Sequence, residues 1–151
     1  MAYYPYKGFH FSVNIDGISG GGNDMSFQSV KGLEVQLDVE NIKEGGLNTF
    51  EHNIPTRVKY STLTLERGIF KPENSELIKW CQKAFTEFDF SPKTVTIHLL
   101  NDKGNPLIVW NITHAYPKSW KIKDLNSTQN EVLIETLELQ YNSFTMEGKP
   151  Y

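Results

Sequence analysis

Cysteine is almost absent from this sequence: Cys81 is the single one among 151 residues, which excludes an internal disulfide framework and fits a reducing compartment. Long apolar runs are missing too, so no stretch reaches membrane-spanning length and we expect no membrane insertion. The amino-terminal stretch Met1–Phe11 lacks a basic start followed by an apolar run, which predicts no secretory signal. These absences indicate synthesis and assembly in the cytoplasm.

Neither sign of charge is in strong excess. The chain has 15 Lys and Arg against 18 Asp and Glu, and its formal net charge is −3. Such a chain has no global field that would draw it to nucleic acid or anionic lipid, so we expect no sequence-specific nucleic-acid partner. Hydrophobic residues make up 38% and charged residues 22%. This balance predicts one folded domain over residues 1–151 rather than a disordered chain.

Clusters of catalytic or metal-binding residue types are also missing. The four histidines stand apart, none at metal-ligand spacing with another His, Cys or Asp, so neither a metal nor a cofactor is predicted. They are His10, His52, His98 and His114. Glu66 with Arg67, or Glu135 with Glu138, comes nearest to an acid–base set, but nothing in the sequence places them in one cleft. We interpret them as surface charge and predict a protein that is not an enzyme.

What the sequence does have is alternation with period two. Apolar and polar side chains alternate through Leu33–Glu40, which is typical of a strand with one apolar and one acidic face. Phe9–Asp16 and Tyr60–Arg67 alternate in the same way, and Gly32 is a predicted bend ahead of the first of these stretches. Gly45–Pro55 has no period of its own and is predicted to be a long connection.

The carboxy-terminal half predicts further strands. Thr94–Leu100 and Leu107–Thr113 flank a Gly-containing turn and are predicted to form a hairpin. Ser119–Lys123 and Glu131–Tyr141 are predicted strands, and the polar tail after Phe144 is expected to fray. With about seven or eight strands and one helix, the predicted fold class is mainly β: an antiparallel β-barrel or sandwich with one amphipathic helix.

The single helix is predicted where the period changes to three and four residues. Asn74 or Ser75 is a suitable N-cap ahead of this stretch. Its predicted core face consists of Leu77, Trp80, Cys81 and Phe85. On that face the thiol of Cys81 is expected to be buried and inert.

Three tryptophans leave an alternative function open. Trp80, Trp110 and Trp120 could form a sugar-stacking platform, although Trp80 falls on the core face of the helix and Trp110 ends an apolar strand. This alternative is a small β-sandwich module that binds carbohydrate or another ligand.

The strand faces indicate a second possibility. Long alternating strands with few devices for shielding sheet edges can pair with other copies, and a head-to-tail interface that closes makes a ring. A wide shared barrel needs a polar inner wall because side chains cannot fill it. The candidates for this wall are Glu34, Gln36, Asp38, Glu40, Thr62, Thr64 and Glu66. Alternation alone leaves open whether this polar face meets a channel, a surrounding protein or bulk solvent.

A set of segments spread over nearly the whole chain carries a resemblance to a known family. They are Phe11–Gly17, Phe27–Glu34, Lys43–Gly46, Ile54–Pro55, Tyr60, Leu63–Ile69, Trp80, Leu100–Gly104, Trp110, Ala115–Pro117, Asn126 and Asn130–Leu139. In these segments the sequence resembles the tail tube proteins of contractile injection systems. These include the inner tubes of contractile phage tails and of phage-tail-like particles such as the antifeeding prophage and the Photorhabdus virulence cassette.

The resemblance implies a non-enzymatic subunit without a cofactor. Six copies would form a ring, and stacked rings would form a hollow tube inside a sheath that is driven through a target envelope to deliver cargo. The implied partners are further copies of the chain, the sheath, baseplate or tube-initiator and terminator proteins, and a cargo or spike in the lumen. By the family's pattern, the loop Gly45–Pro55 would reach a neighbouring subunit or ring, with Leu47, Phe50 and Ile54 buried only on assembly. Bulk tube subunit and baseplate-proximal paralogue remain equally open.

Overall fold

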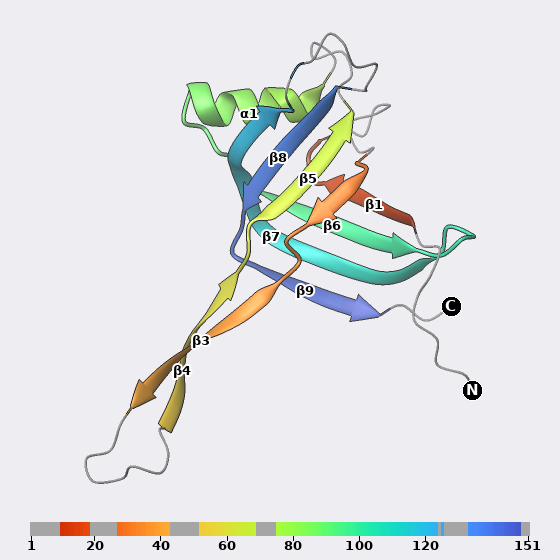
Figure 1. The fold of residues 1–151 in the computed structure, drawn as a ribbon. Coiled ribbons are helices and arrows are strands. Elements are labelled where there is room, and N and C mark those ends of the chain that lie inside the picture. The colour runs from red at the N-terminus through yellow and green to blue at the C-terminus, as the bar shows by residue number, and fades with distance from the viewer. Residues whose placement is uncertain are drawn as a thin grey trace.

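A computed structural model describes residues 10–18, 27–42, 52–68, 75–123, 125 and 133–148 (Figure 1). The elements are β1 (His10–Ile15), β2 (Ser29–Lys31), β3 (Val35–Ile42), β4 (His52–Tyr60), β5 (Leu63–Gly68), α1 (Glu76–Thr86), β6 (Lys93–Leu100), β7 (Pro106–Ile122), β8 (Ile134–Gln140) and β9 (Ser143–Gly148). The predicted class, a mainly β antiparallel fold with one helix, is confirmed for this part of the chain. The sheet is not closed into a barrel within the described residues.

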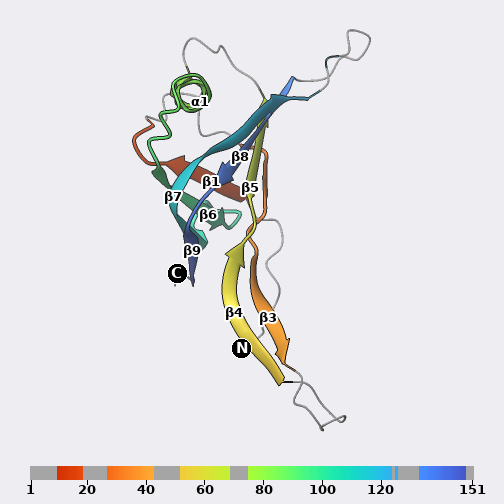
Figure 2. The same ribbon diagram turned by 90° about the vertical axis from the view of Figure 1, so that its left-hand side faces the viewer.

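Seven strands form one antiparallel sheet in the order β1-β6-β7-β8-β5-β2, and β9 pairs with β7. The 17-residue β7 connects the two halves of this sheet: its first part pairs with β6 and β9, and Tyr116–Ile122 pairs with β8. The predicted separate strand Ser119–Lys123 is therefore the continuation of β7, with a bulge between Pro117 and Ser119. Because β7 bends through both halves, their inner faces enclose a common core (Figures 1 and 2).

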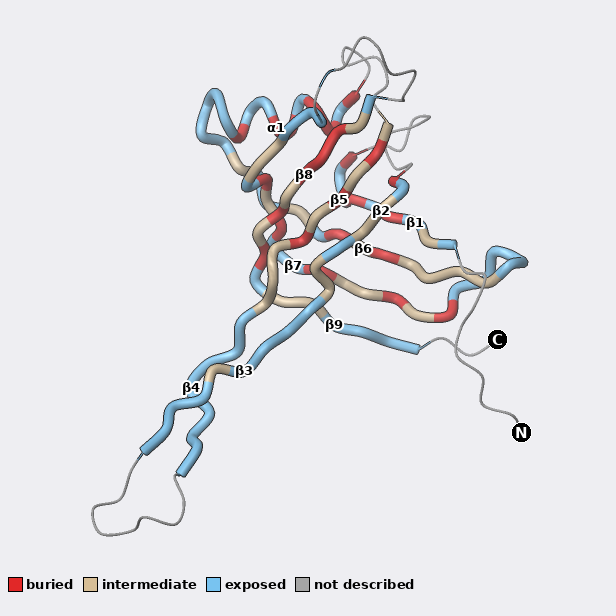
Figure 3. The backbone as a smooth tube through the Cα atoms, viewed as in Figure 1, coloured by how far each residue is buried: buried red, intermediate tan, exposed pale blue. Residues whose placement is uncertain are grey.

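The core draws one apolar stripe from each long strand. Its fully buried members alternate along their strands, as period-two burial requires. They include Val13, Ile15, Leu63, Leu65, Val95, Ile97, Ile112, Leu137 and Leu139. Helix α1 adds Leu77, Trp80 and Cys81. Buried residues concentrate in this body, whereas β3 and β4 project from it and are almost entirely exposed (Figure 3).

The projecting hairpin and the strands β2 and β5 form one long two-stranded ribbon. The pairing register between β2 and β5 continues into the hairpin, where Val35 lies opposite Tyr60. Between the two segments the ribbon is interrupted at Gly32, which has a φ of +95°. A Cβ at this position would lie 2.0 Å from the carbonyl oxygen of Thr62, so a residue without a side chain is required there. The predicted bend at Gly32 is confirmed.

Two predictions about irregular segments are wrong. The connection expected over Gly45–Pro55 is shorter, because β4 begins at His52. The tail after Phe144 is not frayed over its described part: β9 pairs with β7 from Ile108 to Thr113. The alternation in this strand is short: Phe144 and Met146 alternate with Ser143, Thr145 and Glu147, and the backbone pairing with β7 completes it.

Helix α1 begins as predicted. The Ser75 side chain accepts a hydrogen bond from the Ile78 N–H and caps the helix. The last turn differs from the prediction, because Phe85 is 49% exposed. The helical period sets the direction of a side chain, but the extent of the covering sheet decides whether it is buried. Phe85 was expected on the core face and is instead a surface residue.

Candidate assembly site

The β3–β4 hairpin has one side that is apolar and uncovered. Val35, Leu37 and Val39 of β3 lie on this side, and the register places Val58 of β4 beside them. All four are between 51% and 55% exposed. A two-stranded hairpin without a covering layer is at best marginally stable in water. The chain thus presents a strand pair whose apolar side has no partner among the described residues.

At the interruption near Gly32, the ribbon changes which of its two sides faces the body of the protein. In β5, Leu63 and Leu65 face the core and the alternate residues face away. At the end of β4 it is Tyr60 that contacts the body, with its ring centroid 5.9 Å from that of Tyr141 and 5.1 Å from that of Phe144. The apolar side of the hairpin is the Tyr60 side. The polar side of the hairpin therefore points away from the body, as the polar side of β5 does.

The polar side of the hairpin carries charges of both signs. It contains Gln36, Asp38 and Glu40 from β3, and Arg57 and Lys59 from the opposite strand. Beyond the bulge, Ile42 and Ile54 also lie on this side. Lys59 Nζ lies 3.1 Å from the Asp38 carboxylate, and Arg57 is directly opposite Asp38 in the register. The carboxylates of β3 lie on one side of that strand, as the alternation predicts, and the opposite strand adds positive charge to the same side. The alternation in β3 predicted its carboxylates, but only the cross-strand register shows which residues neutralise them.

Two further members of the predicted wall lie on the body. Thr64 and Glu66 are on the outer side of β5, and Glu138 of β8 is opposite Thr64. Glu66 forms an ion pair of 3.7 Å with Lys31 of β2. This surface is again polar with mixed charge, so it hydrates well without a strong field of one sign.

The remaining members of the predicted set lie near the interruption of the ribbon. Glu34 accepts hydrogen bonds from the side chains of Gln36 and Ser61. Thr62 accepts one of 3.4 Å from Lys118 Nζ. The structure thus places the whole set on polar sides that face away from the core, in two segments joined at Gly32.

Several strands have a free edge within the described residues. β1 and β2 are the two ends of the sheet and each has a single neighbour, while β3 and β4 pair only with each other. Unpaired backbone N–H and C=O groups at such edges are a template for pairing with another chain. Of the loop residues predicted to be buried on assembly, Ile54 is 44% exposed in β4, and Leu47 and Phe50 lie outside the described residues.

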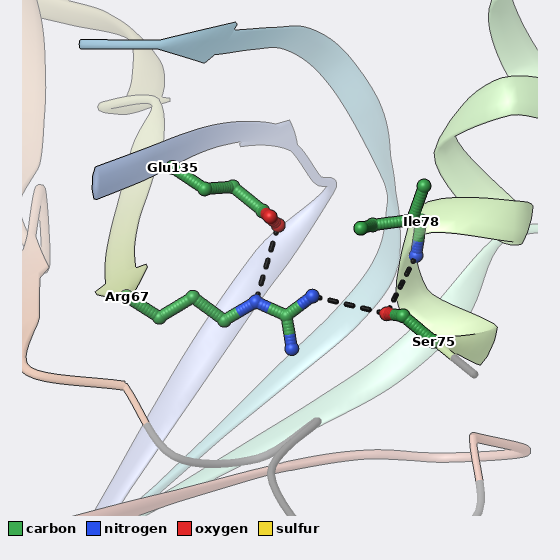
Figure 4. Close-up of polar contacts among 4 residues, drawn as sticks. All are labelled: Arg67, Ser75, Ile78 and Glu135. Atoms are coloured by element: carbon green, nitrogen blue, oxygen red, sulfur yellow. Dashed lines mark hydrogen bonds and ion pairs between the residues drawn. The ribbon is translucent and has the colours of Figure 1, made fainter. Parts of the chain in front are cut away.

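A buried ion pair holds α1 to the sheet (Figure 4). Arg67 Nε lies 3.1 Å from Glu135 Oε1, and both side chains are 1% exposed. Arg67 Nη2 also donates a 3.0 Å hydrogen bond to the Ser75 hydroxyl, which caps the helix. The interpretation of Arg67 and Glu135 as surface charge is wrong. The alternation in the sequence already indicated their burial. Arg67 lies two residues after the inward-facing Leu65 in β5, and Glu135 lies two residues before the inward-facing Leu137 in β8, so both point inward.

The described residues offer little reactive chemistry. Burial raises the pKa of the Cys81 thiol to about 12, with the Glu135 charge as a smaller cause, so the thiol stays protonated and inert at neutral pH. No group of three or more metal-ligating side chains occurs in the described segments, and no helix there is long and apolar enough to cross a membrane. Trp80 is buried, and Trp110 and Trp120 pack against the core, so they do not form an exposed stacking platform.

An open sheet with free edges and a projecting hairpin with one uncovered apolar side are features typical of a subunit that assembles with other chains. The sequence matches the family of the T4-like virus tail tube protein gp19 over residues 7–145, and the chain belongs to this family. It is a tail tube subunit of a contractile injection system and a component of a phage-tail-like particle, with a structural rather than an enzymatic role.

Solved structures give the same assignment. The chain resembles a protein in the baseplate of the anti-feeding prophage with 30% identity and a TM-score of 0.82, covering 98% of each chain. It resembles a protein in the extended sheath–tube complex of the PVC extracellular contractile injection system with 26% identity and a TM-score of 0.80, covering 97% of this chain and 93% of that one. A type six secretion system protein with 12% identity and a TM-score of 0.63 shares the fold, with coverage of 93% and 83%. A comparison with curated protein sequences found no match.

Proposed function

We propose that six copies of this chain close into a ring and that rings stack into a hollow tube inside a sheath. The observation that carries this proposal is the hairpin, whose apolar side is uncovered in the single subunit. Completing the burial of four half-exposed aliphatic side chains stabilises an assembly by roughly 1 kcal/mol each, about half the value for full burial. A second copy with the same open edges supplies the missing cover and the missing strand pairing.

We also propose that the polar sides of the ribbon line the bore of this tube. The set is the predicted one: Glu34, Gln36, Asp38, Glu40, Thr62, Thr64 and Glu66. This proposal is supported by the change of side at Gly32. Because of it, the polar side faces away from the core in both the hairpin and β5. Apart from Ile42 and Ile54 at the far end of the hairpin, this wall is hydrated and of mixed charge, so it has no strong field to hold a passing cargo.

The finer biological role follows from this geometry and from the relatives. Related subunits occur in baseplate, sheath–tube and terminator complexes. We infer that this tube meets the corresponding sheath, baseplate or tube-initiator and terminator proteins, carries a cargo or spike in its lumen, and is driven through a target envelope after assembly in the cytoplasm. No feature of the described residues favours the bulk tube over the baseplate-proximal position.

The test compares the two sides of the hairpin. Leu37→Asp with Val58→Asp places charge on the apolar side, and we expect a folded subunit that forms neither rings nor tubes in negative-stain images. The matched control is Gln36→Cys on the polar side, which should assemble normally. Because Cys81 is buried, the new thiol can be labelled selectively. In assembled tubes it should react with a small maleimide and be protected from a bulky polymer-linked one.

Three results would contradict these proposals. Normal tubes from the double Asp variant would show that the hairpin is not an assembly surface. Equal reaction of Gln36→Cys with both maleimides would show that the polar side faces the outside of the tube. A wild-type chain that stays monomeric at every concentration would overturn the whole assignment.

A further inference from the structure

The surface around the end of α1 and the start of β6 combines a cationic hollow with exposed aromatic rings. We call it the α1–β6 surface, and its residues are Lys79, Lys83, Phe85, Phe88, Phe90, Lys93 and Tyr116. The hollow has a volume of about 180 Å³ and is lined by the three lysines together with Gly17, Glu76, Trp80 and Ser91. None of the open edges or the apolar side of the hairpin contributes to it.

The lysines of the hollow have no counterion within the described residues. Lys79 and Lys83 are one helical turn apart on α1, and Lys93 Nζ lies 5.9 Å from the centre of the Trp80 ring. No ion pair or hydrogen bond joins any of the three to a described side chain. Two carboxylates stand against these three positive charges: Glu76 in the lining, and Asp89, which accepts a hydrogen bond from Ser91 of the lining. A positive excess remains on a chain whose net charge is −3. Such a hollow attracts an anionic group.

The aromatic part of the surface includes a residue in a strained backbone conformation. Phe88 has a φ of +57°, a region that glycine usually occupies after a helix, and its side chain is 82% exposed. The segment is anchored by Trp80, whose indole N–H donates to the carbonyl oxygens of Phe90 and Ser91 at 3.0 and 3.1 Å. Strain and a large exposed ring together indicate a binding role, because neither stabilises the isolated subunit.

Successive ring contacts extend this aromatic surface. The centroids of Phe88 and Phe90 are 4.7 Å apart, and those of Phe90 and Tyr116 are 5.5 Å apart. Beside them, Phe90, Tyr116, Pro92 and His114 line a shallow apolar hollow of about 300 Å³. The lysine hollow and the aromatic rings are therefore neighbours, because the short segment from Phe90 to Lys93 contributes residues to both.

The side of the sheet on which α1 lies decides which partner can reach this surface. Arg67 and Glu135 project from the inner side of β5 and β8 toward Ser75 at the start of α1 (Figure 4). Thr64 and Glu138 are paired across the two strands and alternate with these inward residues, so they project from the opposite side. The helix and the polar strand side are thus on opposite sides of this sheet. If the polar side lines the bore, as in the proposed function, α1 faces outward.

We propose that the α1–β6 surface is the docking site for an acidic segment of the surrounding sheath subunit, with a carboxylate in the lysine hollow and an apolar side chain against Phe88. This inference rests on the proposed function for its inside–outside direction. The positive excess of the hollow selects an acidic partner, and the outward position selects the sheath rather than cargo.

The experiment uses preformed tubes and purified sheath subunits in co-sedimentation at low and high salt. Lys79→Glu with Lys83→Glu should leave tube formation unchanged and weaken sheath binding about tenfold or more at low salt, with a smaller effect at high salt. Lys103→Glu, an exposed lysine in the turn between β6 and β7, is the matched control and should bind sheath normally.

Phe88→Gly separates binding from folding. Glycine accommodates the positive φ without strain, so we expect equal or higher stability to urea together with weaker sheath binding. A merely structural role for Phe88 would give unchanged sheath binding.

Each remaining outcome has a defined meaning. Normal sheath binding by the double Glu variant overturns the docking site. Loss of tubes in that variant also overturns it, because the surface would then lie between copies of the chain. Failure of wild-type tubes to form would instead overturn the proposed function.

Discussion

Strands β4 and β5 follow each other directly along the chain and both alternate between apolar and polar residues, yet their apolar residues differ in burial. Leu63 and Leu65 of β5 are fully buried, whereas Val58 of β4 is 54% exposed. The body covers β5 with β8 and the core, and nothing among the described residues covers the hairpin. The comparison shows that a period-two pattern identifies the apolar side of a strand but not whether the same chain covers it. For the hairpin, we propose that a second copy provides the cover.

The largest expected effect comes from comparing the two ion pairs. Arg67–Glu135 in the body and Lys59–Asp38 in the hairpin both have a distance of 3.1 Å, but the first pair is 1% exposed on each side and the second is 61% and 37% exposed. Arg67→Met should destabilise the subunit by about 3–5 kcal/mol because it leaves a buried, uncompensated carboxylate. Lys59→Met should cost less than about 1 kcal/mol. Urea unfolding of monomeric protein measures both.

A double variant checks the reason for that difference. Arg67→Met combined with Glu135→Leu removes both charges and should recover much of the lost stability. If the double variant were as unstable as the single one, the cost would come from packing or from the lost hydrogen bond to Ser75 rather than from the unpaired charge.

The next effect sharpens the comparison of apolar residues. Leu65→Ala should lower the free energy of unfolding by about 2–5 kcal/mol, as expected for a fully buried leucine. Leu37→Ala at an exposed hairpin position should change subunit stability by less than about 0.5 kcal/mol. Thermal unfolding of dilute subunits gives the two values. Similar losses at both positions would show that the hairpin is covered within the single chain.

The smallest of the three effects concerns the joint between the regions. Gly32 and Gly104 both have positive φ, at +95° and +84°, but a Cβ would meet backbone only at Gly32. Gly32→Ala should therefore cost about 1–3 kcal/mol more than Gly104→Ala, which carries the conformational strain alone. Equal losses in urea unfolding would indicate that Thr62 moves away freely and that the interruption is not sterically fixed.

The fold was predictable where one face of an element is apolar and the next polar. The strands from Val35 to Ile42 and from Leu63 to Gly68, the helix from Glu76 and the bend at Gly32 all follow from such local signals. The strand after Asn142 was missed, because its alternation has only two apolar residues, Phe144 and Met146, and its pairing with β7 is a long-range contact. Likewise, Phe85 follows the helical period but extends beyond the cover that buries Cys81.

The candidate site was predictable in composition but not in arrangement. Alternation predicted which side chains share the polar side of β3, but Arg57 and Lys59 join that side only through the antiparallel register. The buried pair of Arg67 and Glu135 shows the same limit. The alternation along each strand places both residues inward. Only the pairing of β5 with β8 brings Arg67 Nε to 3.1 Å from Glu135 Oε1.

By itself, the sequence determined the local conformations of this protein: which segments extend, where the ribbon needs a glycine, and which side of each strand seeks cover, because these depend on neighbours a few residues away. The tertiary structure alone decided which charges meet, that β7 passes through both halves of the sheet, and that the hairpin remains uncovered. These outcomes depend on contacts between segments distant along the chain, and their free energies are set by burial that no local pattern records.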